Sequence, residues 1–158
     1  MTLSEIVSAY IRDHRESARS ETRCFEIEPN LRAAIRKAAL CLRPSDKHPQ
    51  QWNKRHSHQW HLSKAVLEES ERRLQRSTKE LQLVSDFAAL HHTVEREIGT
   101  IHGIGALTVY DVAHRIGAFL GKSPELVYLH RGTKIGAAAL GLSGKAIRPN
   151  ELPSPFLA

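Results

Sequence analysis

The sequence predicts an all-α, single-domain protein, a bundle of about six helices, and three observations support that prediction. Apolar residues recur at helical spacing through most of the chain, and capping residues precede the periodic segments. The 158 residues are 41% hydrophobic and 25% charged, which suits a globular domain with a sizeable core. We therefore expect one helical domain over residues 1–142, followed by an irregular tail over 143–158.

The N-terminal part of the chain predicts one helix followed by a loop. Thr2 and Glu5 form a capping-box pattern, and apolar residues follow at helical spacing, so a helix is expected over about 3–16. Polar and charged residues over 16–23 indicate a loop. The alternating pattern over 24–28 suits extended chain, because the sequence offers no obvious partner strand.

A second helix is expected to begin at Pro29 and Asn30 and to end at Pro44. The following segment, 43–62, lacks helical period and carries a net charge of +3, both tryptophans and four of the ten histidines. Interleaved cations and aromatic rings suit a nucleic-acid strand, because cations contact phosphates and rings stack on bases. The residues expected to do so are Trp52, Lys54, Arg55 and Trp60.

Three other interpretations of segment 43–62 stay open. His56, His58 and His61 can hold a metal ion, since imidazoles suit zinc or copper, but no other ligand completes such a site locally. We therefore assign neither a metal nor a cofactor. The tryptophans can instead pin the segment to the core. The same histidines can also act as acid–base groups, because imidazole titrates near neutral pH.

Ser63 is predicted to cap a long third helix. Leu67, Leu74 and Leu81 recur every seven residues and form a narrow apolar seam, which suits packing against another helix or a second copy of the chain. A homodimer through these leucines is one expectation. A non-catalytic dimerisation or scaffold protein is accordingly one candidate function.

The stretch that bears most on function joins two patterned segments through a glycine-rich turn. One helix is expected over about 86–98 and another over 106–120. The turn between them, 99–105, reads Gly-Thr-Ile-His-Gly-Ile-Gly. Glycines in such a turn supply positive φ or a close backbone approach. The amides that begin the second helix lie at the positive end of its dipole, which is a phosphate site in principle.

This stretch resembles the hairpin of the helix-hairpin-helix family of nucleic-acid-binding modules. The family pattern is apolar-x-x-apolar-Pro-Gly-apolar-Gly, and the residues that fill it and the helix after it are Ile98, Ile101, Gly103, Ile104, Gly105, Val109 and Val112. His102 stands where the family usually has proline. The resemblance covers residues 98–120, within an element spanning 86–120, and implies a module that grips nucleic-acid backbones. An ordinary turn with no ligand is the alternative.

Phosphate contacts are expected from the turn and from cations elsewhere in the chain. The turn residues are His102, Gly103, Ile104 and Gly105, and the cations are Lys122, Arg131 and Lys134. The last two are included because residues 126–132 faintly repeat residues 98–103, which suggests a second phosphate contact.

Asp111 and His114 lie one turn apart on the helix expected at 106–120. Their contact can orient an imidazole for base catalysis, but a surface pair worth about 0.2–0.5 kcal/mol explains the spacing as well. Catalysis that uses His58, Asp111 or His114 is the enzyme alternative, namely a small nuclease or a toxin-like ribonuclease.

Two short helices are predicted near the C-terminus. Gly121 is the expected stop of the helix at 106–120. Pro124 suits a first helical turn, so a helix is expected from there to Gly132. Thr133 is then expected to cap a last helix over 134–140.

The net charge of +6 is compatible with a polyanionic partner. We predict binding of nucleic acid, with DNA favoured over RNA, largely independent of sequence and without catalysis, although the enzyme alternative stays open. The chain has no Walker loop, HExxH or GxSxG motif. No apolar stretch approaches the roughly 20 residues of a membrane span. We therefore expect a cytoplasmic protein with no membrane partner.

Overall fold

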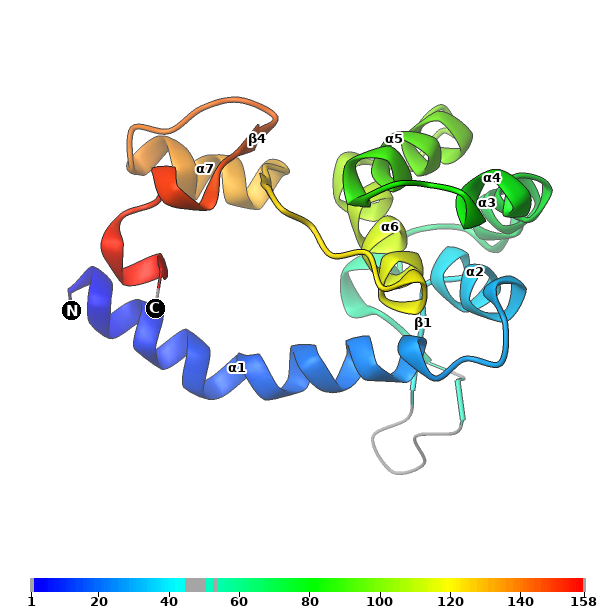
Figure 1. Cartoon of the computed structure of the whole chain (residues 1–158), viewed down its shortest axis with the longest axis horizontal. Coiled ribbons are helices and arrows are strands. Elements are labelled where there is room, and N and C mark those ends of the chain that lie inside the picture. The colour runs from blue at the N-terminus through cyan, green and yellow to red at the C-terminus, as the bar shows by residue number, and fades with distance from the viewer. Residues whose placement is uncertain (1, 45–50, 53, 158) are drawn as a thin grey trace. The chain divides into compact units, whose positions relative to one another are not determined.

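The computed structural model describes residues 2–44, 51–52 and 54–157 (Figure 1). It is mostly helical, as predicted, with short two-residue strands as its only sheet structure in those ranges. Internal contacts divide the chain into two compact units, one formed by residues 1–20 and 124–158 and the other by residues 21–123. None of the helices in the described ranges is long and apolar enough to cross a bilayer.

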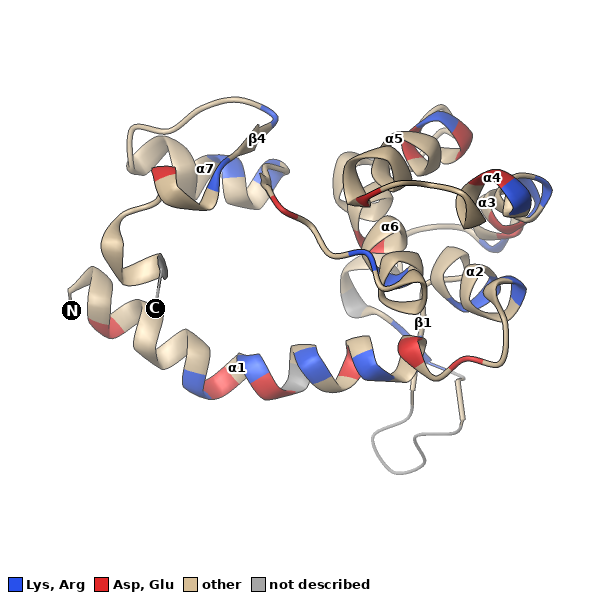
Figure 2. Ribbon diagram, in the orientation of Figure 1, with Lys and Arg blue, Asp and Glu red and all other residues tan. Residues whose placement is uncertain are grey.

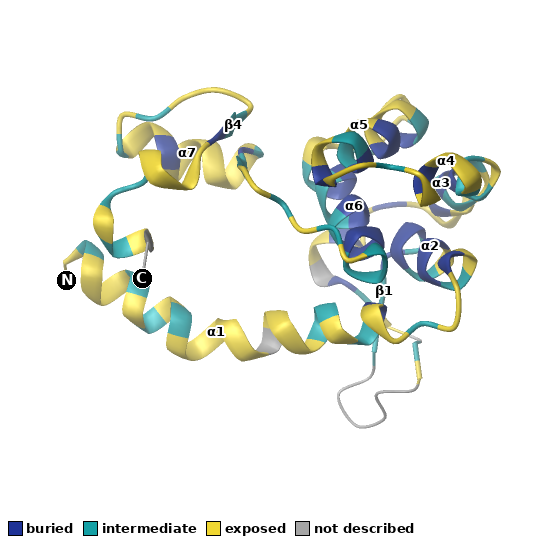
Figure 3. Ribbon diagram, in the orientation of Figure 1, coloured by how far each residue is buried: buried dark blue, intermediate teal, exposed yellow. Residues whose placement is uncertain are grey.

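The unit of residues 21–123 is built from helices packed around one apolar interior (Figure 3). Its elements are the end of α1 (Leu3–Glu26), α2 (Leu31–Ala39), β1 (Leu42–Arg43), β2 (Lys54–Arg55), the 3₁₀ turn η1 (Ser57–Gln59), α3 (Lys64–Arg76), α4 (Thr78–Gln82), α5 (Phe87–Ile98) and α6 (Ala106–Leu120). The α6 helix packs against both α2 and α5. It therefore occupies the middle of the unit and positions the glycine-containing turn that precedes it.

Helix α1 is longer than the sequence predicts. The capping box is confirmed, since the Thr2 backbone N–H donates to Glu5 Oε2 at 2.6 Å and Thr2 Oγ1 accepts from the Glu5 N–H at 3.3 Å. The loop expected over 16–23 and the extended chain over 24–28 are wrong, because the helix continues to Glu26. Phe25 is completely buried. Burial of that ring favours helix over the local polar composition, which a local pattern does not reveal.

Helix α2 begins as predicted and ends early. Asn30 Oδ1 accepts from the Ala33 N–H at 2.9 Å, which caps the helix. The helix stops at Ala39 instead of reaching Pro44, and Cys41 adopts a left-handed conformation with φ 53°. The chain then runs extended, and β1 pairs with β2 in antiparallel register. Residues 45–50 and 53 of the predicted 43–62 loop lie outside the described residues.

The leucine seam is internal, so the homodimer expected through it is wrong. Leu67, Leu74 and Leu81 are no more than 1% exposed, because they fill the core of their own unit. The Ser63 cap is confirmed by its hydrogen bond from the Val66 N–H at 3.3 Å. A break at Ser77 separates α3 from α4, and the third leucine belongs to the shorter helix.

Helices α5 and α6 approach each other closely at Gly117. A Cβ atom added there would lie 2.5 Å from the Lys122 carbonyl oxygen and 3.3 Å from side-chain carbons of Leu90 and Phe87. Gly121 ends α6 in the left-handed region with φ 66°, as the sequence predicts. The chain then folds back so that the Lys122 N–H donates to the Gly117 carbonyl at 2.8 Å.

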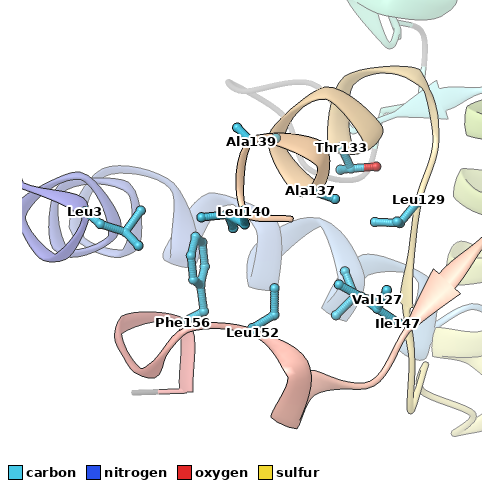
Figure 4. A pocket seen from close by; sticks show the side chains of 11 residues that line it. Leu3, Val127, Leu129, Thr133, Ala137, Ala139, Leu140, Ile147, Leu152 and Phe156 are labelled. Carbon is cyan, nitrogen blue, oxygen red and sulfur yellow. The ribbon is translucent and has the colours of Figure 1, made fainter. Parts of the chain in front are cut away.

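The unit of residues 1–20 and 124–158 has a smaller core. Its C-terminal elements are β3 (Val127–Tyr128), α7 (Arg131–Ala139), β4 (Ala146–Ile147) and the 3₁₀ turns η2 (Pro149–Glu151) and η3 (Ser154–Leu157). Leu129, Ala137 and Ile147 form the buried cluster. An apolar hollow of about 400 Å³ adjoins it, and the labelled side chains that line it include Leu3, Leu140 and Phe156 (Figure 4).

Two predictions fail in this unit. The helix expected from Pro124 to Gly132 is absent, because Val127 and Tyr128 pair with β4 as a strand. The last helix begins at Arg131 and not at 134, since Thr133 Oγ1 accepts from the His130 N–H at 2.8 Å inside the first turn. The tail over 143–158 is also less irregular than predicted, because it contains β4 and two 3₁₀ turns.

The close approach at Gly117 makes a stability prediction. Gly117→Ala should lower the free energy of unfolding by about 1–3 kcal/mol, because the added methyl group overpacks a fixed backbone carbonyl. Gly136→Ala, inside α7, is the control, since a Cβ there meets nothing within 4 Å, and we expect it to leave stability unchanged or to raise it by up to about 1 kcal/mol. Urea denaturation followed by circular dichroism measures both. Equal stability of the two variants would contradict the packing argument.

Candidate nucleic-acid interface

The predicted turn between α5 and α6 is present, and two of its glycines, Gly103 and Gly105, have different roles. Ile98 ends α5, and Ala106 begins α6. Gly103 has φ 94°, a conformation that strains other residues, so glycine is required there. Gly105 has φ −103° and ψ 172°, which any residue adopts, and it serves as the N-cap of α6. Its lack of a side chain leaves open the first turn of α6, which receives no side-chain cap.

The turn presents a mixed surface. His102, Gly103 and Gly105 are exposed, so the backbone at this end of α6 is open to solvent. Ile104 points the other way and packs against the buried cluster that contains Cys41 and Leu62. Its backbone N–H donates to the Ile101 carbonyl at 3.0 Å. Ile104 therefore anchors the turn and leaves no donor for the phosphate contact predicted from it.

One cation beside the turn was not predicted as part of the site. Arg73 Nη1 donates to the Glu97 carbonyl at 3.2 Å and to Thr100 Oγ1 at 3.1 Å, while its Nε donates to Glu69 at 2.6 Å. Basic and acidic residues are mixed along the ribbon of α3 (Figure 2), and the charge of Arg73 is partly balanced by its ion pair with Glu69. Because Arg73 lies more than 20 residues before the turn in sequence, only the packing of α3 on α5 reveals the contact.

The basic segment reaches the turn at its C-terminal end. Leu62 lies 3.7 Å from the position of a Cβ on Gly103. Arg55 Nη1 donates to the Leu62 carbonyl at 3.0 Å, which ties β2 to the same place. Lys54 is exposed next to it. The structure thus brings Arg55 close to the turn, whereas the Lys54 side chain points to the opposite face of β2.

The two tryptophans behave differently. Trp52 packs edge-on against the buried ring of Phe25, with 4.9 Å between centroids, and Lys37 Nζ lies 4.3 Å from the Trp52 ring. Trp52 therefore pins the segment to the core, which was one of the alternatives. Trp60 is 70% exposed and donates its Nε1–H to the Arg55 carbonyl at 3.1 Å. Its ring face is open to a stacking partner.

Of the remaining predicted cations, one lies away from the turn and two belong to the other unit. Lys122 lies beyond the far end of α6, which is about 22 Å long at 1.5 Å per residue, and its Nζ donates to the Ser85 carbonyl at 2.8 Å. Lys122 is therefore no part of this site. Arg131 and Lys134 are exposed on α7, which belongs to the other unit.

The Asp111–His114 pair is not the contact that forms. His58 Nε2 lies 2.8 Å from Asp111 Oδ2, and Gln59 Nε2 donates to the same oxygen at 3.1 Å. His114 instead stacks on the ring of Tyr110, with 5.8 Å between centroids and 12° between planes. Burial lowers the pKa of His114, which favours its neutral form.

Behind the His58–Asp111 contact, a chain of polar groups runs into the interior. Arg115 is 5% exposed and Gln59 is fully buried. Arg115 Nη1 donates to Gln59 Oε1 at 3.4 Å, and Arg115 Nε donates to Glu21 Oε1 at 3.2 Å. His56 Nε2 also lies 3.2 Å from Glu21 Oε1, an ion-pair distance without hydrogen-bond geometry. This network of polar side chains links the end of α1, the basic segment and α6.

The candidate metal ligands do not converge. The rings of His56 and His58 are 5.9 Å apart, and His61 is exposed. Within residues 2–44, 51–52 and 54–157, no three His, Cys, Asp or Glu side chains come together as a metal site requires. Of the roles that the sequence left open for these three histidines, acid–base chemistry does not require them to converge.

No family model, curated protein or solved structure matches this chain. The resemblance to helix-hairpin-helix modules therefore rests on the residues of 98–120 alone.

The buried polar chain predicts acid sensitivity. Burial alone would raise the pKa of Glu21, but His56 and Arg115 outweigh it and hold that pKa at about 2, below its ordinary value of 4.5. A depressed carboxyl pKa stabilises the fold above pH 4.5, and this contribution is lost as the pH falls toward 2. Glu21→Gln should therefore lower the free energy of unfolding at pH 7, with a deficit that shrinks between pH 4.5 and 2.

Urea denaturation across that pH range measures the deficit. Glu26→Gln, an exposed change on the same helix, is the control and should leave stability almost unchanged at every pH. A Glu21→Gln deficit that stays constant as the pH falls would show that the carboxylate charge is not the cause.

Proposed function

We propose that the chain binds nucleic acid through backbone phosphates at the turn between α5 and α6, largely independent of base sequence. The observation that carries the proposal is the open N-terminus of α6. Its first turn receives no side-chain cap, and Gly103 and Gly105 are exposed beside it. Unpaired amide groups at the positive end of a 15-residue helix favour an anion, and phosphate fits such a site.

Nearby groups support this choice of ligand. Arg73 and Arg55 supply positive charge close to the turn, and Trp60 offers an exposed ring that a base can stack on. The whole chain carries a net charge of +6, which favours approach of a polyanion. None of these contacts reads base edges, so the proposed binding is insensitive to sequence.

A salt titration tests the proposal directly. The chain should retain fluorescein-labelled duplex or single-stranded oligonucleotides at low salt in an anisotropy assay. For duplex DNA, the logarithm of the affinity should fall by about 0.9 per phosphate contact for each tenfold rise in salt, because contacts release counterions. Absence of binding to both oligonucleotides at low salt would overturn the proposal.

A single residue distinguishes the turn from general basic charge. Gly105→Asp should cap α6, because Gly105 already has N-cap backbone angles, and so leave stability unchanged or raised by up to about 1 kcal/mol. The new carboxylate also takes the place of the phosphate at the end of α6 and repels it. The affinity for the oligonucleotide should therefore fall at least tenfold, a larger loss than removal of one counterion contact would cause.

Gly105→Ala is the matched variant, because it adds bulk without charge or a cap in a space where nothing lies within 4 Å. It should bind within about twofold of the parent chain. If Gly105→Asp folds normally and binds as well as Gly105→Ala, the α6 terminus is not the phosphate site.

A further inference from the structure

We propose that His58 acts as a general base that cleaves RNA held at the turn between α5 and α6. This inference rests on the proposed nucleic-acid binding and adds a reaction to it. It stands on a contact between segments 53 residues apart, in which His58 Nε2 meets Asp111 Oδ2 at 2.8 Å. The His58 side chain is 45% exposed and that of Asp111 is 17% exposed. The pair is therefore rooted in the fold but open to a substrate on the histidine side.

The hydrogen bonds behind the pair fix which nitrogen of His58 is basic. Arginine only donates, so the Gln59 oxygen must face Arg115 and its amide N–H₂ must face Asp111. A carboxylate oxygen only accepts, so Asp111 accepts from both Gln59 and His58 Nε2–H. Neutral His58 therefore carries its lone pair on Nδ1, the nitrogen that can take a proton from a substrate.

The buried members of this network of polar side chains are suited to support a reactive group. Gln59 is fully buried and Arg115 is nearly so, although polar groups in an interior must be paired to be tolerated. Their hydrogen bonds end on Asp111, which holds the imidazole of His58 in one orientation. An orienting carboxylate behind a histidine base is an arrangement that recurs in acid–base catalysis.

The position of the pair matches the proposed phosphate site. Asp111 lies five residues after Ala106 on the same helix, about 7.5 Å along its axis at 1.5 Å per residue. Leu62, four residues after His58, lies against the turn at Gly103. A strand bound by one phosphate at the turn can therefore pass His58 within one or two nucleotides.

The reaction follows from what a base alone can do. His58 Nδ1 takes the proton of an RNA 2′-hydroxyl, and the 2′-oxygen forms a bond to the adjacent phosphorus. The bond from phosphorus to the 5′-oxygen breaks, and that oxygen takes a proton from water. The products are a 2′,3′-cyclic phosphate and a 5′-hydroxyl, and His58 returns its proton to solvent. DNA lacks the 2′-hydroxyl, so this inference selects RNA, whereas the sequence resemblance favoured DNA.

The experiment uses the full chain with a labelled single-stranded RNA and with the same sequence as DNA. The chain should bind both and cleave only the RNA, leaving a 2′,3′-cyclic phosphate end. His58→Gln keeps a side-chain N–H for Asp111 but removes the base, so it should slow cleavage by about 100-fold or more. Its affinity for the DNA strand and its melting temperature should not change. His92→Gln, at an exposed histidine on α5, should cleave like the parent chain.

The outcomes separate the two proposals. RNA that is bound but stays intact, or cleavage that His58→Gln leaves unchanged, overturns the assignment of His58 while nucleic-acid binding stands. Loss of binding to the DNA strand in His58→Gln would show that the pair supports the interface instead of the reaction. A parent chain that binds neither strand removes both proposals.

Discussion

The burial of Arg115 is the constraint on which the rest of the larger unit depends. A guanidinium that is 5% exposed must be paired, because an unpaired charge in an apolar interior is strongly destabilising. Glu21 from α1 and Gln59 from the basic segment supply the partners. These polar contacts hold the two segments against α6 together with apolar contacts, since Phe25 of α1 and Leu62 of the basic segment are buried as well. The pairing of Glu21 thus adds to the burial of Phe25 in favouring helix at the end of α1.

The same requirement sets the surroundings of the turn between α5 and α6. Gln59 holds its segment on α6, and three residues later Leu62 reaches Gly103. The exposed backbone of the turn, Arg55 of β2 and the half-exposed His58 therefore share one neighbourhood. A phosphate-binding end of a helix and an oriented imidazole are each common in proteins. Here the proposed phosphate-binding helix end and the oriented imidazole both lie along α6. The proposed binding and the proposed cleavage therefore share one surface.

The smaller unit shows a different balance of forces. Only Leu129, Ala137 and Ile147 are buried among its described residues, and two short strands flank α7. With so little core, the pairing of Val127 and Tyr128 with β4 decides the local structure. The apolar hollow beside this cluster follows from the small side chains of α7, which leave space that larger residues would fill.

The sequence by itself determined the helical class, the caps at Thr2, Asn30 and Ser63, and the glycine-containing turn, because these depend on residues within one or two turns of each other. Val109 and Val112, which fill the pattern in the helix after the turn, are buried. Only the tertiary structure decided the full length of α1, the burial of the leucine seam and the pairing of β3 with β4. The partner of Asp111 was decided in the same way, since the sequence offered only His114, one turn away, and His58 meets Asp111 only when α6 and the basic segment are packed together. Each of these depends on contacts between distant segments, and local propensity is too weak to decide against them.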